Sequence, residues 1–246
     1  MVNNRFYMLG HTAALSVAAQ QLEALGISFT PSPDDAVTHL LLPVPAFAPD
    51  GSVKGGGNLQ AALAELPKTV CVIGGNLDHP ALSGYQTVDL LKDPFYVTQN
   101  AQITAHCAIR LAMQQLPVTF DKLPTLVIGW GRIGKCLARL LKDLGADVTV
   151  ACRKDTDRAM LQALGYRAVS TQALSGKPYR VIFNTAPEMV LPYSPDGILK
   201  IDLASRPGIG GTDVLQARGL PGKDAPESSG MLIAQTIARL RKEKLL

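Results

Sequence analysis

The sequence predicts an α/β protein made of two doubly wound parallel-sheet units. Three observations lead to this fold class. Short apolar runs alternate with helical patterns along almost the whole chain. The runs are nearly continuous in apolar residues, as in strands of a parallel sheet that helices cover on both faces. A glycine-spaced turn, Gly129-x-Gly131-x-x-Gly134, directly follows one of these runs and opens a helical pattern. The two units are expected to join near residue 98.

The first unit is expected over residues 1–97, as the substrate side of the protein. A helical pattern over residues 12–26 ends at Gly26, which is a typical C-terminal cap. A second helix is expected over residues 58–66, with Asn58 as its N-cap. The expected strands of this unit are 5–10, 27–30, 39–45, 69–75 and 85–90.

The second unit is expected over residues 98–225, beginning with an interdomain helix over 100–116 that Pro117 ends. A final helix over 226–246 is expected to pack back across the domains. Asp224 is its expected N-cap, and Glu227 follows three residues later, as in a capping box. The expected strands are 125–130, 146–152, 166–170, 180–186 and 197–204. The apolar face of the final helix is expected to include Ile233, Ile237 and Leu240.

Composition excludes several classes of protein. With 246 residues, of which 47% are hydrophobic and 18% charged, the chain can form a sizeable core. A net charge of +4, no long basic run and 5% aromatic residues argue against a nucleic-acid surface. No apolar run approaches the roughly 18 residues of a membrane helix, and no signal peptide is visible. The four scattered cysteines indicate neither disulfides nor a metal site, so a cytoplasmic setting is expected.

The glycine turn has the context of a Rossmann-type dinucleotide-binding motif, because it lies between a predicted strand and a helix. In that motif, Gly129 permits the tight turn, Gly131 lets the backbone approach a pyrophosphate, and Gly134 lets the helix pack closely on the strand. The free N–H groups at the start of the helix, from Arg132 and Ile133 onward, face the phosphates. The alternative is a glycine turn that binds nothing.

The end of the next strand decides which dinucleotide is expected. NAD enzymes carry an acidic residue there, which holds the ribose 2′-hydroxyl. This chain instead has Cys152-Arg153-Lys154. Two cations at this place favour the 2′-phosphate of NADP, which a guanidinium can bind bidentately. The alternative is that Arg153 and Lys154 are solvated loop residues.

Further segments resemble the family of the dipicolinate synthase A-subunit. They are "LLPVPAFAPDGSV" at 41–53, "NTAPEMVL" at 184–191, "IDLASRPGIGGTD" at 201–213 and "GLPGKDAPESSG" at 219–230. The likeness covers most of residues 38–246 and is most specific over 125–235. One segment departs from the family pattern. In "NAQITAHC", Asn100 and Thr104 match, but a proline is missing and His106 stands where the family has an acid.

The resemblance implies an NADP-dependent oxidoreductase that converts dihydrodipicolinate into dipicolinate during sporulation. It also implies a small dicarboxylate substrate and a flavoprotein-like second subunit; a homo-oligomer is a further possibility. A nucleotide-binding regulatory or scaffold subunit without chemistry is one alternative. A relative of the 2-hydroxyacid dehydrogenases is another, weakened because all four histidines (His11, His39, His79 and His106) precede the nucleotide turn.

Six further residues are candidates for the site. Thr185, Ala186 and Pro187 end a strand and are expected near the nicotinamide, unless they form a plain strand exit. Asp202 and Arg206 follow the carboxyl end of the next strand, where open α/β sheets bind ligands. Arg206 could clamp a substrate carboxylate, and Asp202 has the alternative of holding the following loop. His106 could accept the substrate proton, or be a packing residue.

Overall fold

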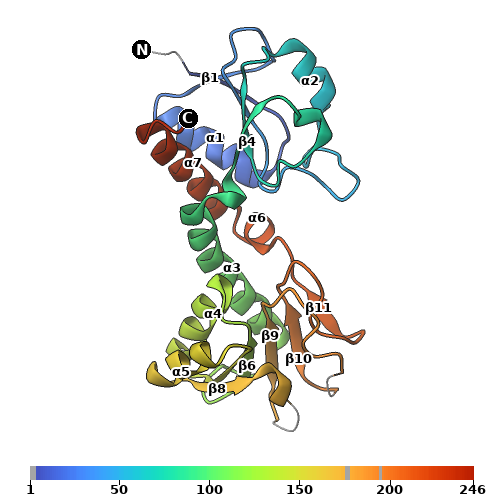
Figure 1. The fold of residues 1–246 in the computed structure, drawn as a ribbon, viewed down its shortest axis with the longest axis vertical. Helices are drawn as coiled ribbons and strands as arrows, with labels where there is room; N and C mark the ends of the chain where they lie inside the picture. The colour runs from blue at the N-terminus through green and yellow to red at the C-terminus, as the bar shows by residue number, and fades with distance from the viewer. Residues whose placement is uncertain (1–3, 175–177, 194–195) are drawn as a thin grey trace. The chain divides into compact units, whose positions relative to one another are not determined.

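The structure is a computed structural model that describes residues 4–174, 178–193 and 196–246. It divides the chain into two compact units, each built on its own parallel sheet (Figure 1). Unit 1 comprises Met1–Asn100 and Pro221–Leu246, and unit 2 comprises Ala101–Leu220. The first boundary, expected near residue 98, thus lies within helix α3 (Pro94–Gln115), and the C-terminal segment is grouped with unit 1.

Unit 1 is a five-stranded sheet in the order β2-β1-β3-β4-β5, with every neighbouring pair parallel. This order is that of a doubly wound, flavodoxin-like sheet. Its strands are β1 (Arg5–Met8), β2 (Ser28–Thr30), β3 (His39–Leu41), β4 (Cys71–Gly74) and β5 (Gln86–Asp89). Its helices are α1 (Ala13–Ala24), α2 (Leu59–Glu65), α7 (Pro226–Lys242) and the short 3-10 turns η1 (Pro80–Leu82) and η2 (Leu90–Lys92).

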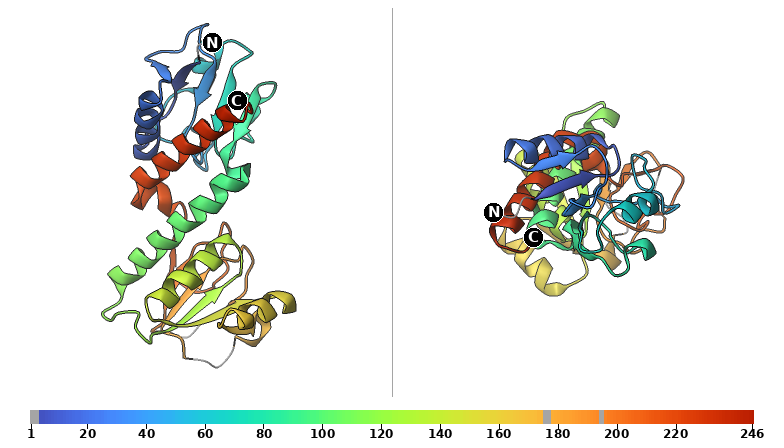
Figure 2. Two further views of the ribbon diagram at one scale, coloured as in Figure 1. Left: turned by 90° about the vertical axis from the view of Figure 1, so that its left-hand side faces the viewer. Right: turned by 90° about the horizontal axis from the view of Figure 1, so that it is seen from above.

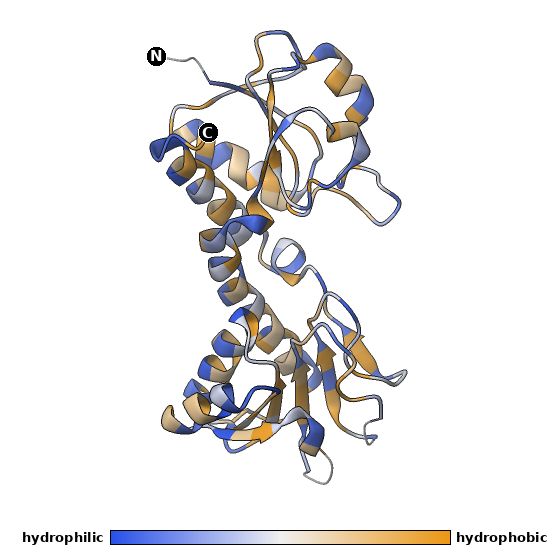
Figure 3. Ribbon diagram, viewed as in Figure 1, coloured by the Kyte–Doolittle hydropathy of each residue, from blue (hydrophilic) through white to orange (hydrophobic). Residues whose placement is uncertain are grey.

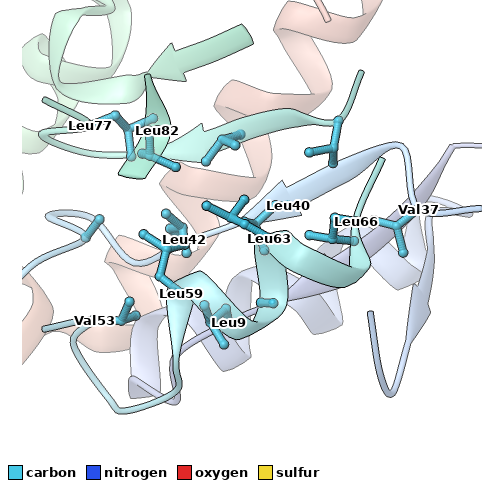
Figure 4. Packing of buried hydrophobic residues seen from close by; sticks show 14 residues of the cluster. Leu9, Val37, Leu40, Leu42, Val53, Leu59, Leu63, Leu66, Leu77 and Leu82 are labelled. Carbon is cyan, nitrogen blue, oxygen red and sulfur yellow. The ribbon is translucent and has the colours of Figure 1, made fainter. Parts of the chain in front are cut away.

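The apolar core of unit 1 lies between β3 and α2. Figure 4 shows Leu59, Leu63 and Leu66 of the α2 segment facing Leu40 and Leu42. The predicted N-cap of this helix is confirmed, because the Asn58 side chain accepts a hydrogen bond from the Ala61 N–H at 3.1 Å. The cap thus fixes the start of the helix that covers one face of the sheet.

Helices α1 and α7 pack side by side in unit 1, although they lie at opposite ends of the sequence (Figure 2). A Cβ at Gly230 would lie 2.5 Å from the Ala14 carbonyl oxygen and 2.6 Å from Val17 Cβ, so only glycine fits at this contact. The predicted apolar face of α7, Ile233, Ile237 and Leu240, is buried. The predicted N-cap is wrong: Asp224 ends the short helix α6 (Leu220–Asp224), and Ala225 precedes α7 without a side-chain cap.

Unit 2 is a six-stranded sheet in the order β11-β10-β9-β6-β7-β8, again with every neighbouring pair parallel. This is the strand order of the Rossmann fold, so the predicted fold class is confirmed. In Figure 3 its central strands are mostly hydrophobic, as expected for a sheet that is buried on both faces. The strands are β6 (Pro124–Ile128), β7 (Asp147–Cys152), β8 (Arg167–Ser170), β9 (Val181–Asn184), β10 (Leu199–Asp202) and β11 (Val214–Gln216).

The helices α4 (Arg132–Asp143) and α5 (Asp155–Ala163) connect the first three strands of unit 2, and the 3-10 turn η3 (Thr171–Ala173) follows β8. Sequence reasoning found α4 but missed α5 and the three-residue strand β11. In α5 the one buried side chain is Leu161, so the apolar periodicity is too sparse to stand out. Helix α3 begins at Pro94, earlier than expected, since proline suits the first turn of a helix.

Histidine 39 is a buried titratable group in unit 1. Its ring stacks on Phe6 with centroids 4.5 Å apart, and its Nδ1 lies 2.8 Å from the Thr38 hydroxyl. The side chain is 7% exposed. Burial, and secondarily the positive charge of Arg241, lowers the pKa of His39 from 6.5 to about 4. The folded protein therefore keeps this imidazole neutral at pH values where the unfolded chain protonates it.

Stability is accordingly expected to fall as the pH drops below 6.5, and to level off below pH 4. The unfolded state binds the proton more readily, so unit 1 should lose about 2 kcal/mol between pH 7 and pH 5. Chemical unfolding at the two pH values measures this difference. A His39→Gln variant should show a smaller pH dependence, whatever its absolute stability. An equal pH dependence in both proteins would contradict the assignment to His39.

None of the described helices combines the length and the apolar character that crossing a bilayer requires. Cys71, Cys136 and Cys152 are free thiols.

Candidate functional site

The turn between β6 and α4 has the backbone that the glycine spacing predicts. Gly129 adopts φ +101°, a conformation that favours glycine, and its N–H donates to the Ala151 carbonyl at 2.8 Å. A Cβ at Gly129 would overlap the Thr185 hydroxyl. Both the backbone angle and the lack of space therefore require glycine at this position.

Gly131 stands at the N-cap of α4, and no side chain caps the helix. A Cβ on Gly131 would meet nothing within 4 Å, so the space in front of the helix start is open. Arg132 and Ile133 follow as the first two residues of the helix. The first N–H groups of a helix have no intrahelical acceptor and lie at its positive end, which suits an anion such as a phosphate.

Gly134 allows α4 to pack closely on the turn, whereas Gly131 leaves open space in front of the helix. A Cβ there would overlap the Gly129 carbonyl oxygen and lie 3.2 Å from the Thr185 hydroxyl. The helix thus approaches the strand end more closely than any other residue type allows. The three glycines have the three different geometries that a dinucleotide turn needs.

Residues at the end of β9 form hydrogen bonds to the end of β6, directly before the glycine turn. The hydroxyl and the N–H of Thr185 each lie 2.8 Å from the Ile128 carbonyl oxygen and donate to it. The Ala186 N–H donates to the Asn184 side-chain oxygen at 3.1 Å, and Pro187 is exposed. Thr185 therefore stabilises the turn, while Ala186 and Pro187 begin the loop that follows β9.

The two predicted cations lie at the carboxyl end of β7. Lys154 is exposed and caps α5 through its backbone alone. Arg153 forms an ion pair with Glu188 at 3.4 Å, with the two side chains 72% and 55% exposed. Since β6 lies between β7 and β9, this pair joins the two segments that flank the glycine turn. An exposed pair of this kind is weak, so an anion can take the place of Glu188.

Sequence reasoning missed Arg158, whose side chain stabilises the backbone at the end of β7. Its NH1 donates to the carbonyl oxygens of Cys152 and Arg153, each at 2.8 Å, and its NH2 pairs with Asp155. The signal in the sequence was an arginine one turn into the helix after a strand, from where it can reach back. Burial, and secondarily the charge of Asp157, raises the pKa of the Cys152 thiol, so this residue adds no negative charge.

Asp202 is fully buried at the end of β10, and its two carboxylate oxygens accept four hydrogen bonds. One oxygen accepts from the Asn184 side chain at 2.8 Å and from the Ala204 N–H at 3.1 Å. The other accepts from the N–H groups of Gly208 and Ile209, at 2.7 and 3.3 Å. Four donors occupy the acceptor sites of the carboxylate, which favours the loop-holding role of Asp202 over the catalytic one.

Asn184, which sequence reasoning passed over, connects this loop to the glycine turn. Its amide donates to Asp202 and, at 3.0 Å, to the Ala186 carbonyl oxygen. A Cβ at Gly208 would overlap this amide, so the loop after β10 packs directly on the end of β9. The structure thus brings together the turn, the end of β9 and the loop after β10.

Arg206 and His106 are both exposed. Among the described residues, Arg206 has no hydrogen-bonding or ion-pairing partner, so its guanidinium is available to a ligand. His106 lies on α3, with its Nε2 3.2 Å from the Gln102 side-chain nitrogen one turn earlier. No hydrogen bond or ion pair joins either side chain to Asp202 within the described ranges, so the three predicted catalytic residues do not form a hydrogen-bonded cluster.

The residues present fit a dinucleotide. The open space at Gly131 and the uncapped start of α4 suit a pyrophosphate. Within the described part of the chain, His, Cys, Asp and Glu side chains nowhere gather into a group of three that could hold a metal ion.

The chain is similar to known proteins in sequence and in fold. No family model matches the chain. The A-subunit of dipicolinate synthase from Bacillus subtilis (strain 168) is 29% identical over 240 residues, which span 86% of this chain and 80% of that protein. The resemblance to this family is confirmed. The crystal structure of the same A-subunit from Bacillus halodurans has a TM-score of 0.84 at 22% identity, covering 97% of both chains.

The fold also extends to more distant proteins. D-lactate dehydrogenase from Escherichia coli has a TM-score of 0.57 at 15% identity, covering 98% of this chain and 96% of that one. At this level of identity, the likeness shows that this chain and the dehydrogenase have a similar fold.

Proposed function

We propose that this chain is the NADP-binding subunit of a dipicolinate synthase and oxidises dihydrodipicolinate to dipicolinate in sporulating bacteria. The observation that carries the proposal is the glycine turn of unit 2. Its open face at Gly131 and uncapped helix start suit a dinucleotide, and the relative at 29% identity is a dipicolinate synthase subunit. The dehydrogenase neighbour in the fold supports an oxidoreductase.

The proposed reaction removes a hydride and a proton from the dihydropyridine ring, which becomes aromatic. When bound, the nicotinamide supplies the hydride acceptor. The protein's part is to orient the ring, bind its two carboxylates and accept the proton. We assign a carboxylate to Arg206, since its guanidinium is exposed and has no partner among the described residues. We assign the proton to the exposed imidazole of His106.

The proposed preference for NADP over NAD comes from the two residues that follow β7. Arg153 and Lys154 place two positive charges where NAD enzymes place an acid. A 2′-phosphate would replace Glu188 as the partner of Arg153, and a phosphate binds a guanidinium more strongly than an exposed carboxylate does. Glu188 therefore competes with NADP for Arg153.

NADP is expected to bind at least about tenfold more tightly than NAD, which corresponds to about 1.4 kcal/mol. Arg153→Ala should remove most of this preference, and Glu188→Gln should strengthen NADP binding because it frees Arg153. Isothermal titration of both dinucleotides measures each constant, with Arg180→Ala as the exposed-arginine control. Equal affinities for the two dinucleotides, or an Arg153→Ala variant that keeps the preference, would refute the assignment.

A nucleotide-binding subunit without chemistry is the second candidate. The saturated hydrogen bonds of Asp202 favour it, because they leave this carboxylate no free site for a substrate proton. The two candidates share the cofactor site and differ in whether the chain supports turnover of dihydrodipicolinate.

A further inference from the structure

Unit 2 has a recess with a volume of about 450 Å³ beside α4 and α5. Figure 1 shows α5 beside β8. Trp130 belongs to the glycine turn, and the other lining residues lie on α4, on α5 and between α5 and β8. The recess is lined by Trp130, Lys135, Arg139, Met160, Leu164 and Tyr166. The cofactor site described above uses none of the last five.

Four of the six lining residues are aromatic or apolar: Trp130, Met160, Leu164 and Tyr166. Trp130 and Tyr166 meet edge to face, with ring centroids 6.0 Å apart and an interplanar angle of 62°. Met160 and Leu164 are 56% and 52% exposed, although both are large apolar side chains. Aromatic residues and methionine are enriched in protein interfaces, where a pocket of this kind receives an apolar side chain of the partner.

Positive charges lie beside the two aromatic rings. Lys135 Nζ lies 5.7 Å from the centre of the Trp130 ring, and Lys142 Nζ lies 4.6 Å from that of Tyr166. Arg139 completes the group and pairs with Asp143 at 3.5 Å, with both side chains more than half exposed. Lys135 and Arg139 line the recess, and Lys142 lies beside Tyr166, where it donates to the carbonyl oxygens of Leu164 and Gly165. These positive charges make an acidic occupant complementary to this surface.

A second copy of the chain fits this surface poorly. A two-fold symmetric contact brings the same patch of both copies together. It would therefore set Lys135, Arg139 and Lys142 of one copy against the same three cations of the other. Charge complementarity favours a different protein as the occupant.

We propose that this recess docks an acidic segment of the second subunit, which inserts a large apolar side chain between Met160, Leu164 and the two aromatic rings. The inference rests on the proposed function, since it takes the second subunit of dipicolinate synthase as the partner.

The test titrates the purified chain with the second subunit from the same organism. Trp130 is the one tryptophan of the chain, so its emission reports directly on the recess. We expect the emission to shift to shorter wavelength when the partner covers it. Met160→Glu and Arg139→Glu should each weaken the complex at least about tenfold. Met113→Glu and Arg180→Glu, at exposed positions elsewhere in unit 2, are the matched controls and should leave the affinity unchanged.

Three outcomes would overturn the proposal. The first is a complex that all four variants form equally well, which would place the partner elsewhere. The second is a self-association of the chain that Met160→Glu abolishes, which would make a second copy the occupant. The third is the lack of any complex with the second subunit. NADP titrations of the same variants separate this test from the proposed function, because dinucleotide binding should remain unchanged in every variant.

Discussion

Replacing Asp202 with alanine is expected to destabilise unit 2 by about 3–5 kcal/mol. The substitution removes a buried carboxylate that accepts four hydrogen bonds. It leaves the N–H groups of Ala204, Gly208 and Ile209 and the amide of Asn184 buried and without their acceptor. Each unsatisfied donor costs about 1–3 kcal/mol, so even partial relaxation leaves a large effect.

Chemical unfolding of the variant measures the loss, with the exposed Asp121→Ala as the control. Asp202→Asn should lie between the wild type and Asp202→Ala, because its amide keeps one acceptor oxygen but brings an NH₂ group against N–H donors. If Asp202 acts only in catalysis, Asp202→Ala will keep the stability of the wild type and lose turnover alone. That result would support a catalytic role for Asp202.

Gly131→Val is expected to weaken dinucleotide binding at least about 100-fold, or about 2.7 kcal/mol. The valine side chain would fill the open space in front of α4, where the backbone is expected to approach the pyrophosphate. Because that space is open in the protein, the variant should fold. Its stability should fall by no more than about 1 kcal/mol, mainly from a poorer N-cap.

Gly134→Ala is the matched comparison within the same turn. Its Cβ would overlap the Gly129 carbonyl oxygen, so the helix start has to move and the protein should lose about 1–3 kcal/mol of stability. Titration with NADP and chemical unfolding of both variants separate the two roles. Unchanged NADP affinity in Gly131→Val would show that the pyrophosphate does not lie on this turn.

The sequence predicted the part of the site that depends on local backbone geometry. The spacing of Gly129, Gly131 and Gly134 requires a turn between a strand and a helix, and the structure has that turn. The strands were predictable because their apolar runs are nearly continuous. Helix α5 was not predicted because Leu161 is its one buried side chain, which leaves no clear apolar periodicity.

The parts that sequence reasoning missed depend on contacts between distant segments. Asn184 and Asp202 are 18 residues apart, and only the pairing of β9 with β10 brings them together. The same holds for Arg153 and Glu188, which meet because β7 and β9 flank β6. Lys200 is 1% exposed in the middle of β10 and pairs with Asp213 at 2.7 Å. A charged residue within an apolar run gave no sign of that partner.

NADP-dependent oxidation of dihydrodipicolinate by this chain is tested most directly by the absorbance of reduced nicotinamide. The purified chain is mixed with NADP and dihydrodipicolinate, with and without the second subunit. We predict formation of NADPH in the presence of the second subunit. We also predict that Arg206→Ala lowers kcat/KM roughly 10- to 150-fold, as for a lost charge-assisted hydrogen bond, while NADP affinity stays unchanged. No NADPH formation in either mixture, by a chain that binds NADP, would contradict the proposed oxidation and leave the non-catalytic nucleotide-binding role.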